Sequence, residues 1–509
     1  MDAFVGVFRS RKLPPSDPPD TPPALPHMVP PVAPALLDAK PSFLTALPAE
    51  IIYEILSFLP ASSLVSLTRA SKLLRLHALT DALWAKFVRE NVPYQQSLQY
   101  YPAQSWRDLY ISLHPYWFLT SNKLWFSDKA YSGSSMTGSL MLARYDPRRG
   151  CIEGLRLLAK QGIHSFELWE WDPEVIIHTF SPEVSLHLDD PIVKIHRGMY
   201  AQHNSARAEI LMNTGYTRGV RSMVSLCQGL TPEEQDDALT LWPPRIVPAK
   251  ERVRKQNRRH FRGEGPSSLR NASENTFRIR KWVEFGGMGA PFGVHIGEDV
   301  MTFSTVPEEY YTPTKEKPWQ GIWVGDYSGH GCEFLLLVQS AVDKSLGRPK
   351  SSAETPPQHH LDGPDLQGRR SLPVRKGEDG SCAGRLEAIK LTGDPNVPRG
   401  EYTWVAEDIG SGGLLRVASE KIFRGARVVK SFGHSAARGF REDQFIPAQL
   451  IMVDHDTLAQ YWQVSPPFLY FKSAVLICSQ DFGHVSFYRR VDIDQYLRNV
   501  DASPAARLP

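Results

Sequence analysis

The spacing of apolar residues changes near residue 116, and this change restricts the folds that the chain can adopt. Before that point, apolar residues recur every three to four positions, as on one face of an α-helix. After it, they alternate with polar residues or form short runs between Gly, Asp, Ser and Pro, as in strands joined by turns. The sequence therefore predicts a helical N-terminal part followed by a larger, strand-rich part.

Charge and cysteine usage exclude several classes of protein. The 509 residues include 58 Lys and Arg against 55 Asp and Glu, a balance that disfavours a globally basic nucleic-acid binder. The five cysteines lie far apart without a CxxC pair, which excludes a dense disulfide framework or a clustered zinc finger. The longest apolar stretch, 468–478, is too short for a membrane span, and no signal peptide is apparent. We expect a cytoplasmic or nuclear protein, or one found in both compartments, that binds neither nucleic acid nor membrane.

Several segments have too few large apolar residues to fold. Residues 1–40 form a Pro-rich arm, which we predict to be disordered and to act as a spacer rather than a PxxP ligand. Disordered insertions are predicted at about 230–275 and at 340–384, and a disordered tail at 499–509.

Three helices are predicted between residues 41 and 92, followed by a helical linker at 93–115. The first starts near Pro48, with Glu50 in its first turn, where the helix dipole favours a carboxylate. The second starts near Ser62 or Ser63, and the third starts with Asp81 as its cap. The apolar faces are wider than such a small bundle can bury, so we expect a partner protein on the first helix.

The stretch 116–498 is predicted to be one β-rich domain, a closed or nearly closed antiparallel barrel or a sandwich. It has no repeat of fixed period, which disfavours a propeller or solenoid. The predicted strands are 116–120, 123–126, 139–145, 152–158, 166–169, 175–180, 276–285, 299–304, 321–339 with an internal turn, 385–391, 401–406, 414–418, 427–430, 449–453 and 485–490.

The order of residue types at 43–91 resembles the F-box, a helical motif that binds the Skp adaptor of cullin–RING ubiquitin ligases. The resemblance is carried by Phe43-Leu44, Leu47-Pro48-x-Glu50-Ile51, Ile55-Leu56, Leu59-Pro60, Leu64, Leu67, Ser71-Lys72 and Leu83-Trp84. An ordinary helical hairpin would explain the leucine periodicity but not this whole order. The resemblance implies adaptor binding by Leu47, Pro48, Glu50, Ile51, Ile55, Leu56, Leu59 and Leu64, with Trp84 bracing the third helix.

Four later segments resemble fungal F-box proteins with a β-rich C-terminal domain, and more distantly the animal F-box-only proteins whose C-terminal half is a barrel-like substrate receptor. These segments are 117–128, 321–337, 386–401 and 424–440. The resemblance implies an α+β fold, in which a three-helix F-box precedes a mainly antiparallel, barrel-like domain with disordered insertions. It is interrupted at 463–481, an apolar segment that we interpret as a retained intron or an error in the gene model.

The segment Gly325–Gly331 brings Asp326, Tyr327 and His330 together with Ser328. It lacks the first Gly of a GxSxG nucleophile elbow, and neighbouring residues rarely form a catalytic triad. A tight turn at the barrel mouth is favoured over catalysis. Such a turn can still line a substrate pocket, so Asp326, Tyr327 and His330 are candidate pocket residues, together with Arg424.

Other motifs point to no cofactor or metal. The glycine clusters at 286–289 and 410–413 do not complete GxGxxG, and His359-His360 stands in a predicted insertion without further ligands. The basic run 250–262 is either a nuclear-import signal or a solvated linker. Arg424, Arg427 and Arg438 are either a phosphate or carboxylate site or solubilising surface residues.

The sequence thus predicts a non-catalytic substrate receptor of an SCF-type (Skp–cullin–F-box) ubiquitin ligase, with the Skp adaptor, the cullin–RING core and a protein substrate as its partners. The receptor acts by proximity and therefore needs no catalytic group of its own. Two alternatives stay open at this point. One is a Skp-bound scaffold outside a ligase, and the other is a barrel protein that binds a small molecule.

Overall fold

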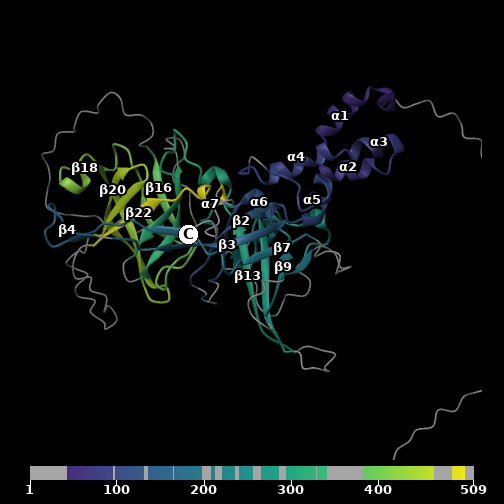
Figure 1. Ribbon diagram of the computed structural model, residues 1–509. Coiled ribbons are helices and arrows are strands. Elements are labelled where there is room, and N and C mark those ends of the chain that lie inside the picture. The colour runs from purple at the N-terminus through teal and green to yellow at the C-terminus, as the bar shows by residue number, and fades with distance from the viewer. Residues whose placement is uncertain are drawn as a thin grey trace, which may run out of the picture.

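The computed structural model describes residues 43–95, 98–130, 134, 136–163, 165–197, 208–212, 220–235, 240–255, 265–285, 294–327, 330–340, 383–462 and 484–498. The predicted arm 1–40, nearly all of the predicted insertion 340–384, the tail 499–509 and the segment 463–481 lie outside these ranges. The described chain has helices at one end, a large sheet in the middle and a barrel at the other end (Figure 1).

Short helices form the N-terminal part, as predicted, but two helices, and not one, lie between Pro60 and Asp81. The polypeptide turns between them, and the Ser71 side chain accepts a hydrogen bond from Leu74 N (3.1 Å), which starts a new helix. The predicted caps at Ser62 or Ser63 and at Asp81 are wrong, because Pro60 and Thr80 precede these helices. The helices are η1 (Phe43–Ala46), α1 (Ala49–Ser57), α2 (Ala61–Leu67), α3 (Lys72–Ala78), α4 (Asp81–Asn91), α5 (Trp106–Leu113) and α6 (Phe118–Asn122).

The first predicted strand, 116–120, is wrong, because these residues lead into the short helix α6. Trp117, Phe118 and Leu119 are all buried. The consecutive apolar residues reflect burial on all sides of this segment, and not a strand with one buried and one exposed face. A short apolar run of this kind does not distinguish a helix from a strand.

The first sheet follows the helices and has the strand order β6-β3-β2-β1-β13-β12-β9-β8, with β7 also paired to β3. It curves around an apolar core, on which α5 and α6 pack, and β7 lies beside β8. Its strands are β1 (Leu124–Ser127), β2 (Leu140–Asp146), β3 (Cys151–Lys160), β6 (Glu183–Leu186), β7 (Val193–His196), β8 (Glu209–Met212), β9 (Val220–Leu226), β12 (Thr276–Phe285) and β13 (Val294–Thr305).

The second sheet closes into an antiparallel barrel of eight strands, which confirms the predicted barrel. Closure comes from β17 and β19, where Trp404 lies opposite Gly433, and β18 adds an outer strand to β19. The strands are β14 (Gly321–Asp326), β15 (Cys332–Ser340), β16 (Arg385–Lys390), β17 (Tyr402–Ala406), β18 (Leu414–Val417), β19 (Arg427–Ala437), β20 (Arg441–Asp454), β21 (Thr457–Trp462) and β22 (His484–Arg490). The helix α7 (Gln495–Arg498) follows the barrel.

The first sheet and the barrel share one apolar core. Leu124 and Phe126 of the first sheet belong to the same cluster of buried side chains as Ile322 and Val324 of the barrel. Two small hairpins join the same cluster: β4 (Phe166–Leu168) with β5 (Ile176–His178), and β10 (Leu241–Trp242) with β11 (Val253–Arg254). The single predicted domain 116–498 therefore contains two large sheets that bury apolar surface against each other.

The predicted disorder at 230–275 is wrong for the middle of that segment. Trp242, Val247 and Val253 are buried in the shared core, and Arg252 donates a hydrogen bond to Val247 O (2.9 Å). The prolines and charges of this stretch suggested a loop, but a few large apolar residues are enough to anchor it. Short 3-10 turns complete the described fold: η3 (Pro232–Gln235), η5 (Leu269–Asn271), η6 (Glu308–Tyr310) and η8 (Lys421–Phe423). None of the helices in the described ranges is long and apolar enough to cross a membrane.

Candidate functional site

The helices α1 to α4 divide their apolar side chains between a core and an exposed surface. The core holds Ile52, Leu56, Leu64, Leu74, Ala78, Leu83 and Trp84. The indole Nε1 of Trp84 donates a hydrogen bond to Ala78 O (2.9 Å), which ties α4 to the end of α3. The exposed set comprises Ile51, Ile55 and Phe58 from α1 and its C-terminal end, Val65 from α2, and Leu73 and Leu76 from α3. We call these six residues the exposed helical surface.

The nine residues that the F-box resemblance singled out fall on both sides of this division. Ile51 and Ile55 belong to the exposed helical surface, and Pro48 and Glu50 are also exposed. Leu47 and Leu59 are partly buried against the core. Leu56, Leu64 and Trp84 are fully buried in that core, so they support the surface from inside. The roles of all nine in adaptor binding stay predictions.

The helical part is held against the first sheet by α5. Arg107 N donates to Asp81 Oδ1 (3.0 Å), which links the start of α5 to the start of α4. The ring of Tyr110 lies 5.6 Å from that of Trp84 and 6.4 Å from that of Trp117, which belongs to the core of the first sheet. Tyr110 therefore connects the core of the helices with the core of the sheet.

A polar pocket of about 160 Å³ lies at one end of the barrel, and we call it the mouth pocket. The strands β14, β16, β19 and β21 end there, and β15, β17, β20 and β22 begin there. An apolar cluster that includes Trp323, Leu335 and Leu450 packs inside the barrel. The pocket is lined by Tyr327, His330, Lys390, Asp394, Asn396, Val397, Thr403, His434, Ser435, Ala436, Ile446, Trp462, His484 and Ser486.

A buried lysine dominates the electrostatics of the mouth pocket. Lys390 Nζ lies 2.9 Å from the carboxylate of Glu333, forms an ion pair with Asp394, and stands 4.3 Å from the ring centre of Tyr327. Burial raises the pKa of Glu333 to about 8, so this carboxyl is protonated at neutral pH. Burial alone would also raise the pKa of Asp394, but the charge of Lys390 outweighs it and lowers the pKa. Lys390 is thus paired with an ionised Asp394 beside a neutral Glu333.

Hydrogen bonds fix the other polar groups of the mouth pocket. The hydroxyls of Tyr327 and Thr403 are 2.6 Å apart, and His434 Nδ1 donates to Tyr402 O (2.9 Å). Trp462 Nε1 donates to Ser486 Oγ (3.1 Å). A ligand therefore meets groups that are already oriented, which is typical of a binding pocket.

Two glycines make room for the aromatic side chains at this end of the barrel. A Cβ on Gly433 would lie 2.1 Å from the Trp462 ring, and a Cβ on Gly325 would lie 2.7 Å from the Tyr488 ring. Any other residue at Gly433 would push Trp462 out of its place beside the pocket. This explains why glycines stand inside strands, where they otherwise weaken pairing.

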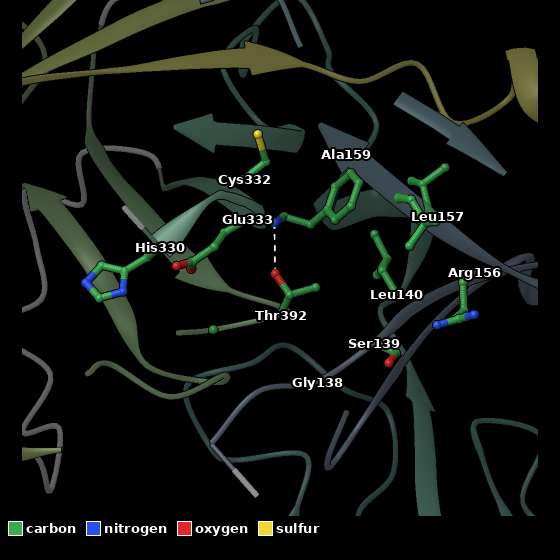
Figure 2. A pocket seen from close by; sticks show the side chains of 13 residues that line it. Gly138, Ser139, Leu140, Arg156, Leu157, Ala159, His330, Cys332, Glu333 and Thr392 are labelled. Atoms are coloured by element: carbon green, nitrogen blue, oxygen red, sulfur yellow. Dashed lines mark hydrogen bonds between the residues drawn. The ribbon is translucent and has the colours of Figure 1, made fainter. Parts of the chain in front are cut away.

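A second pocket, of about 260 Å³, lies at the seam between the first sheet and the barrel. Figure 2 shows Glu333 and His330 on one side of it and Leu157, Arg156 and Ser139 on the other. Phe334 N donates to Thr392 Oγ1 (2.9 Å) across the middle. His330 lines both this seam pocket and the mouth pocket, so the two are neighbours.

The structure separates the predicted pocket residues. Tyr327 and His330 line the mouth pocket. Asp326 does not line it, and its Oδ2 accepts a hydrogen bond from Gln161 Nε2 (2.7 Å), from the stretch that follows β3. Arg424 is exposed just before β19, whereas the pocket lies at the other end of that strand. Arg427 and Arg438 likewise flank opposite ends of β19, so the three arginines form no common anion site.

Within the described ranges, no three His, Cys, Asp or Glu side chains are arranged to hold a metal ion. The residue pair His359-His360 and part of the basic run, 256–262, lie outside those ranges.

Sequence reasoning missed most of the mouth pocket, namely Lys390, Asp394, Thr403, His434, Trp462 and His484, and also Glu333, the buried neighbour of Lys390. One signal was present. Lys390 stands in the strand segment Leu386–Leu391 among apolar residues, where an unpaired lysine would be costly, and an acidic residue follows four positions later. A charge inside a predicted buried strand marks a site when a partner of opposite charge is near.

Comparison with known families adds two findings. Residues 44–90 match the family model described as F-box-like, which covers α1 to α4. Residues 303–495 match the model described as Cyclin D1 binding domain, which includes the whole barrel and every residue of the mouth pocket. Two separate parts of the chain thus match known family models, F-box-like at the N-terminal helices and Cyclin D1 binding domain at the barrel. No curated protein matches the chain.

Proposed function

We propose that this protein is the substrate-recognition subunit of an SCF-type ubiquitin ligase. The F-box-like domain binds the Skp adaptor, the barrel holds a protein substrate, and the cullin–RING core supplies the ubiquitin-loaded enzyme. The observation that carries this proposal is the pairing of an F-box-like domain, with six exposed apolar residues, and a polar barrel pocket at a distance from it. Ubiquitin transfer then gains from proximity, so the receptor itself needs no catalytic group.

The adaptor contact is assigned to the exposed helical surface and not to the buried leucines. Ile51, Ile55 and Phe58 leave 39% to 75% of their surface accessible, a large apolar exposure for such a small helical unit. A contiguous apolar surface of this kind marks a protein interface. Pro48 and Glu50 flank it at the start of α1.

A cyclin is the substrate class to test first, because the family matched at 303–495 is named for binding cyclin D1. The mouth pocket is large enough for one side chain or chain end and not for a folded domain. We therefore propose that the mouth pocket binds one residue of the substrate, and that this contact fixes the position of a longer substrate segment. Two further predictions are kept. The relatives of this protein are predicted to be fungal F-box proteins, and its predicted compartments are the cytoplasm and the nucleus.

Co-purification with the Skp adaptor and the cullin tests the first half of this proposal. Wild type should recover both partners, and the variant Ile51→Ser/Ile55→Ser should lose both while it keeps its folded stability. Leu188→Ser, an exposed residue outside the helices, is the matched control and should behave as wild type. Recovery of adaptor without cullin would support the alternative of an adaptor-bound scaffold outside a ligase.

Binding of purified D-type cyclin tests the second half. Ala436 lines the mouth pocket, so Ala436→Trp should fill it and weaken cyclin binding at least tenfold without loss of adaptor binding. Unchanged cyclin binding in this variant would remove the pocket from the proposal. A small molecule retained by purified wild type but not by Ala436→Trp would instead favour a ligand-binding barrel.

A further inference from the structure

The hairpin β4–β5 lies against the barrel and exposes one apolar face. Phe166 is opposite His178, and Leu168 is opposite Ile176, so these four side chains share one face of the two-stranded ladder. Ile177 points the other way and is fully buried in the shared core. Phe166, Leu168 and Ile176, with Trp171 at the turn, are 51% to 76% exposed. We call the four exposed residues Phe166, Leu168, Trp171 and Ile176 the hairpin face.

The hairpin is held rigidly in spite of its exposure. Trp169 at its turn is buried edge-on against Phe423 and Tyr461 of the barrel. Tyr461 donates a hydrogen bond to Asp172 Oδ2 (2.6 Å), and the guanidinium of Arg416 lies 3.7 Å from the centre of the Trp171 ring. The exposed apolar side chains of the hairpin face are therefore held in place by these contacts and do not belong to a frayed loop.

The hairpin face begins next to the mouth pocket. The strand β5 lies against β22, whose first residue, His484, lines the pocket. From there the hairpin runs along the outside of the barrel to β18, where Arg416 covers Trp171 (Figure 1). A chain that leaves the pocket on this side therefore meets the hairpin face directly.

The hairpin's own charged residues are all acidic, and the one cation described on its face is Arg416 of β18, which stacks on Trp171. Residues 165–178 include the four acidic residues Glu167, Glu170, Asp172 and Glu174 and no Lys or Arg. Glu167 and Glu174 are exposed on the hairpin. A binding partner that complements the hairpin face therefore carries Lys or Arg beside large apolar side chains.

We propose that the hairpin face binds a basic, apolar, extended segment of the protein substrate, next in its chain to the residue held in the mouth pocket. This inference rests on the proposed function, because it assigns a second contact to the same substrate. It predicts a recognition sequence with large apolar residues at alternate positions and Lys or Arg between or beside them.

Selection of phage-displayed random peptides on the full-length protein tests this inference. The enriched peptides should be rich in apolar and basic residues, and their affinity is measured by fluorescence anisotropy at low and high salt. Leu168→Ser/Ile176→Ser should weaken the best peptide about tenfold or more. Glu167→Gln/Glu174→Gln should weaken it about threefold and reduce its salt dependence. Leu188→Ser is the matched exposed control and should stay within twofold of wild type.

The outcomes separate this inference from the proposed function. Binding within twofold of wild type in both hairpin variants, or a selection that yields no peptide dependent on Leu168 and Ile176, overturns the hairpin docking. If only Ala436→Trp loses binding, and the hairpin variants do not, the hairpin docking is likewise overturned, whereas the proposed receptor function is retained. Loss of adaptor and cullin from wild type, with hairpin-dependent peptide binding retained, overturns the ligase assignment and keeps the docking surface. Thermal unfolding of each variant checks that the fold is intact.

Discussion

Ile51 and Ile52 are adjacent and chemically identical, yet 48% of Ile51 is exposed and only 1% of Ile52. Their tasks therefore differ, since one can reach a partner and the other fills the core beside Leu56. We expect Ile52→Ala to reduce the stability of the helical part by about 2–5 kcal/mol through the cavity that it leaves. Ile51→Ala should change stability by less than about 1 kcal/mol and weaken adaptor binding instead.

Urea unfolding of the full chain, together with hydrogen exchange of the amides in α1 to α4, measures the first effect. Adaptor titration measures the second. Equal stability loss in the two variants would contradict the division between core and exposed helical surface. Trp84→Ala provides a positive control, because this fully buried indole also loses its hydrogen bond to Ala78.

Glu333 gives the barrel a pH-dependent stability. Burial raises its pKa from 4.5 to about 8, so between these values the folded state binds a proton that the unfolded state has released. Its contribution to stability is therefore full below about pH 4.5 and is lost as the pH rises toward 8. Relative to Glu333→Gln, we expect the free energy of unfolding of wild type to fall by about 1.4 kcal/mol per pH unit across this window.

Urea unfolding at several pH values between about 5 and 9 checks this expectation, with the difference between wild type and Glu333→Gln as the measured quantity. Most other titrating groups are common to both proteins and cancel. A difference that is constant with pH would show that Glu333 is ionised in the folded state and that Lys390 neutralises it.

At the scale of elements, the hairpin β21–β22 bears on the interruption at 463–481. Trp462 lies directly opposite His484, so the two strands are in register up to the ends of the interrupted segment. Excision of 464–480, one residue inside each end of that segment, would leave a four-residue connection between these paired residues, a length that hairpins use. The register thus needs none of the intervening residues.

We predict that a chain without residues 464–480 folds at least as stably as the full chain. Every valine codon begins with GT and the glutamine codon CAG ends with AG, so Val464 and Gln480 suit the two ends of an intron. The connection shortens from 21 to four residues, which lowers the entropy cost of closing the loop by about 1 kcal/mol or more. Thermal unfolding of both chains measures this. Transcripts that all retain the segment would reject the intron, and a lower melting temperature of the short chain would reject the loop argument.

At the scale of the whole molecule, Tyr110 fixes the helical part relative to the sheets. Its ring packs on Trp84 on one side and on Trp117 on the other. Because proximity drives ubiquitin transfer in the proposed function, a loosened connection should slow transfer without loss of either partner. We expect Tyr110→Ala to keep adaptor and cyclin binding within about threefold and to reduce reconstituted ubiquitination several-fold.

Small-angle scattering of the Tyr110→Ala chain should show a wider distribution of distances than that of wild type. Tyr110→Phe keeps the ring and is the matched control. Full ubiquitination by the alanine variant would mean that the orientation of the helical part is set elsewhere, for example by Arg107 and Asp81.

Local patterns in the sequence predicted much of the fold and little of the site. The alternation of apolar and polar residues predicted a strand at 276–285, and these are the bounds of β12 in the structure. The prediction succeeded because β12 pairs with regular strands on both sides. Alternation failed at Phe118 and Leu119, where burial on all sides removes the period. The mouth pocket joins residues from 327 to 486 through barrel closure. No local spacing encodes which strands meet, so His434 and Trp462 were beyond prediction.

Both large sheets are completed by strands that are distant in the chain. β1 pairs with β13, and β14 pairs with β22, which is the last strand of the described chain. On the ribosome, the F-box-like helices therefore emerge and fold while the barrel is still open and partly unsynthesised. Under the proposed function, an adaptor present during translation would meet its docking surface before any substrate pocket exists. A message cut short before β22 would thus produce a chain that occupies the adaptor but presents nothing to the ligase.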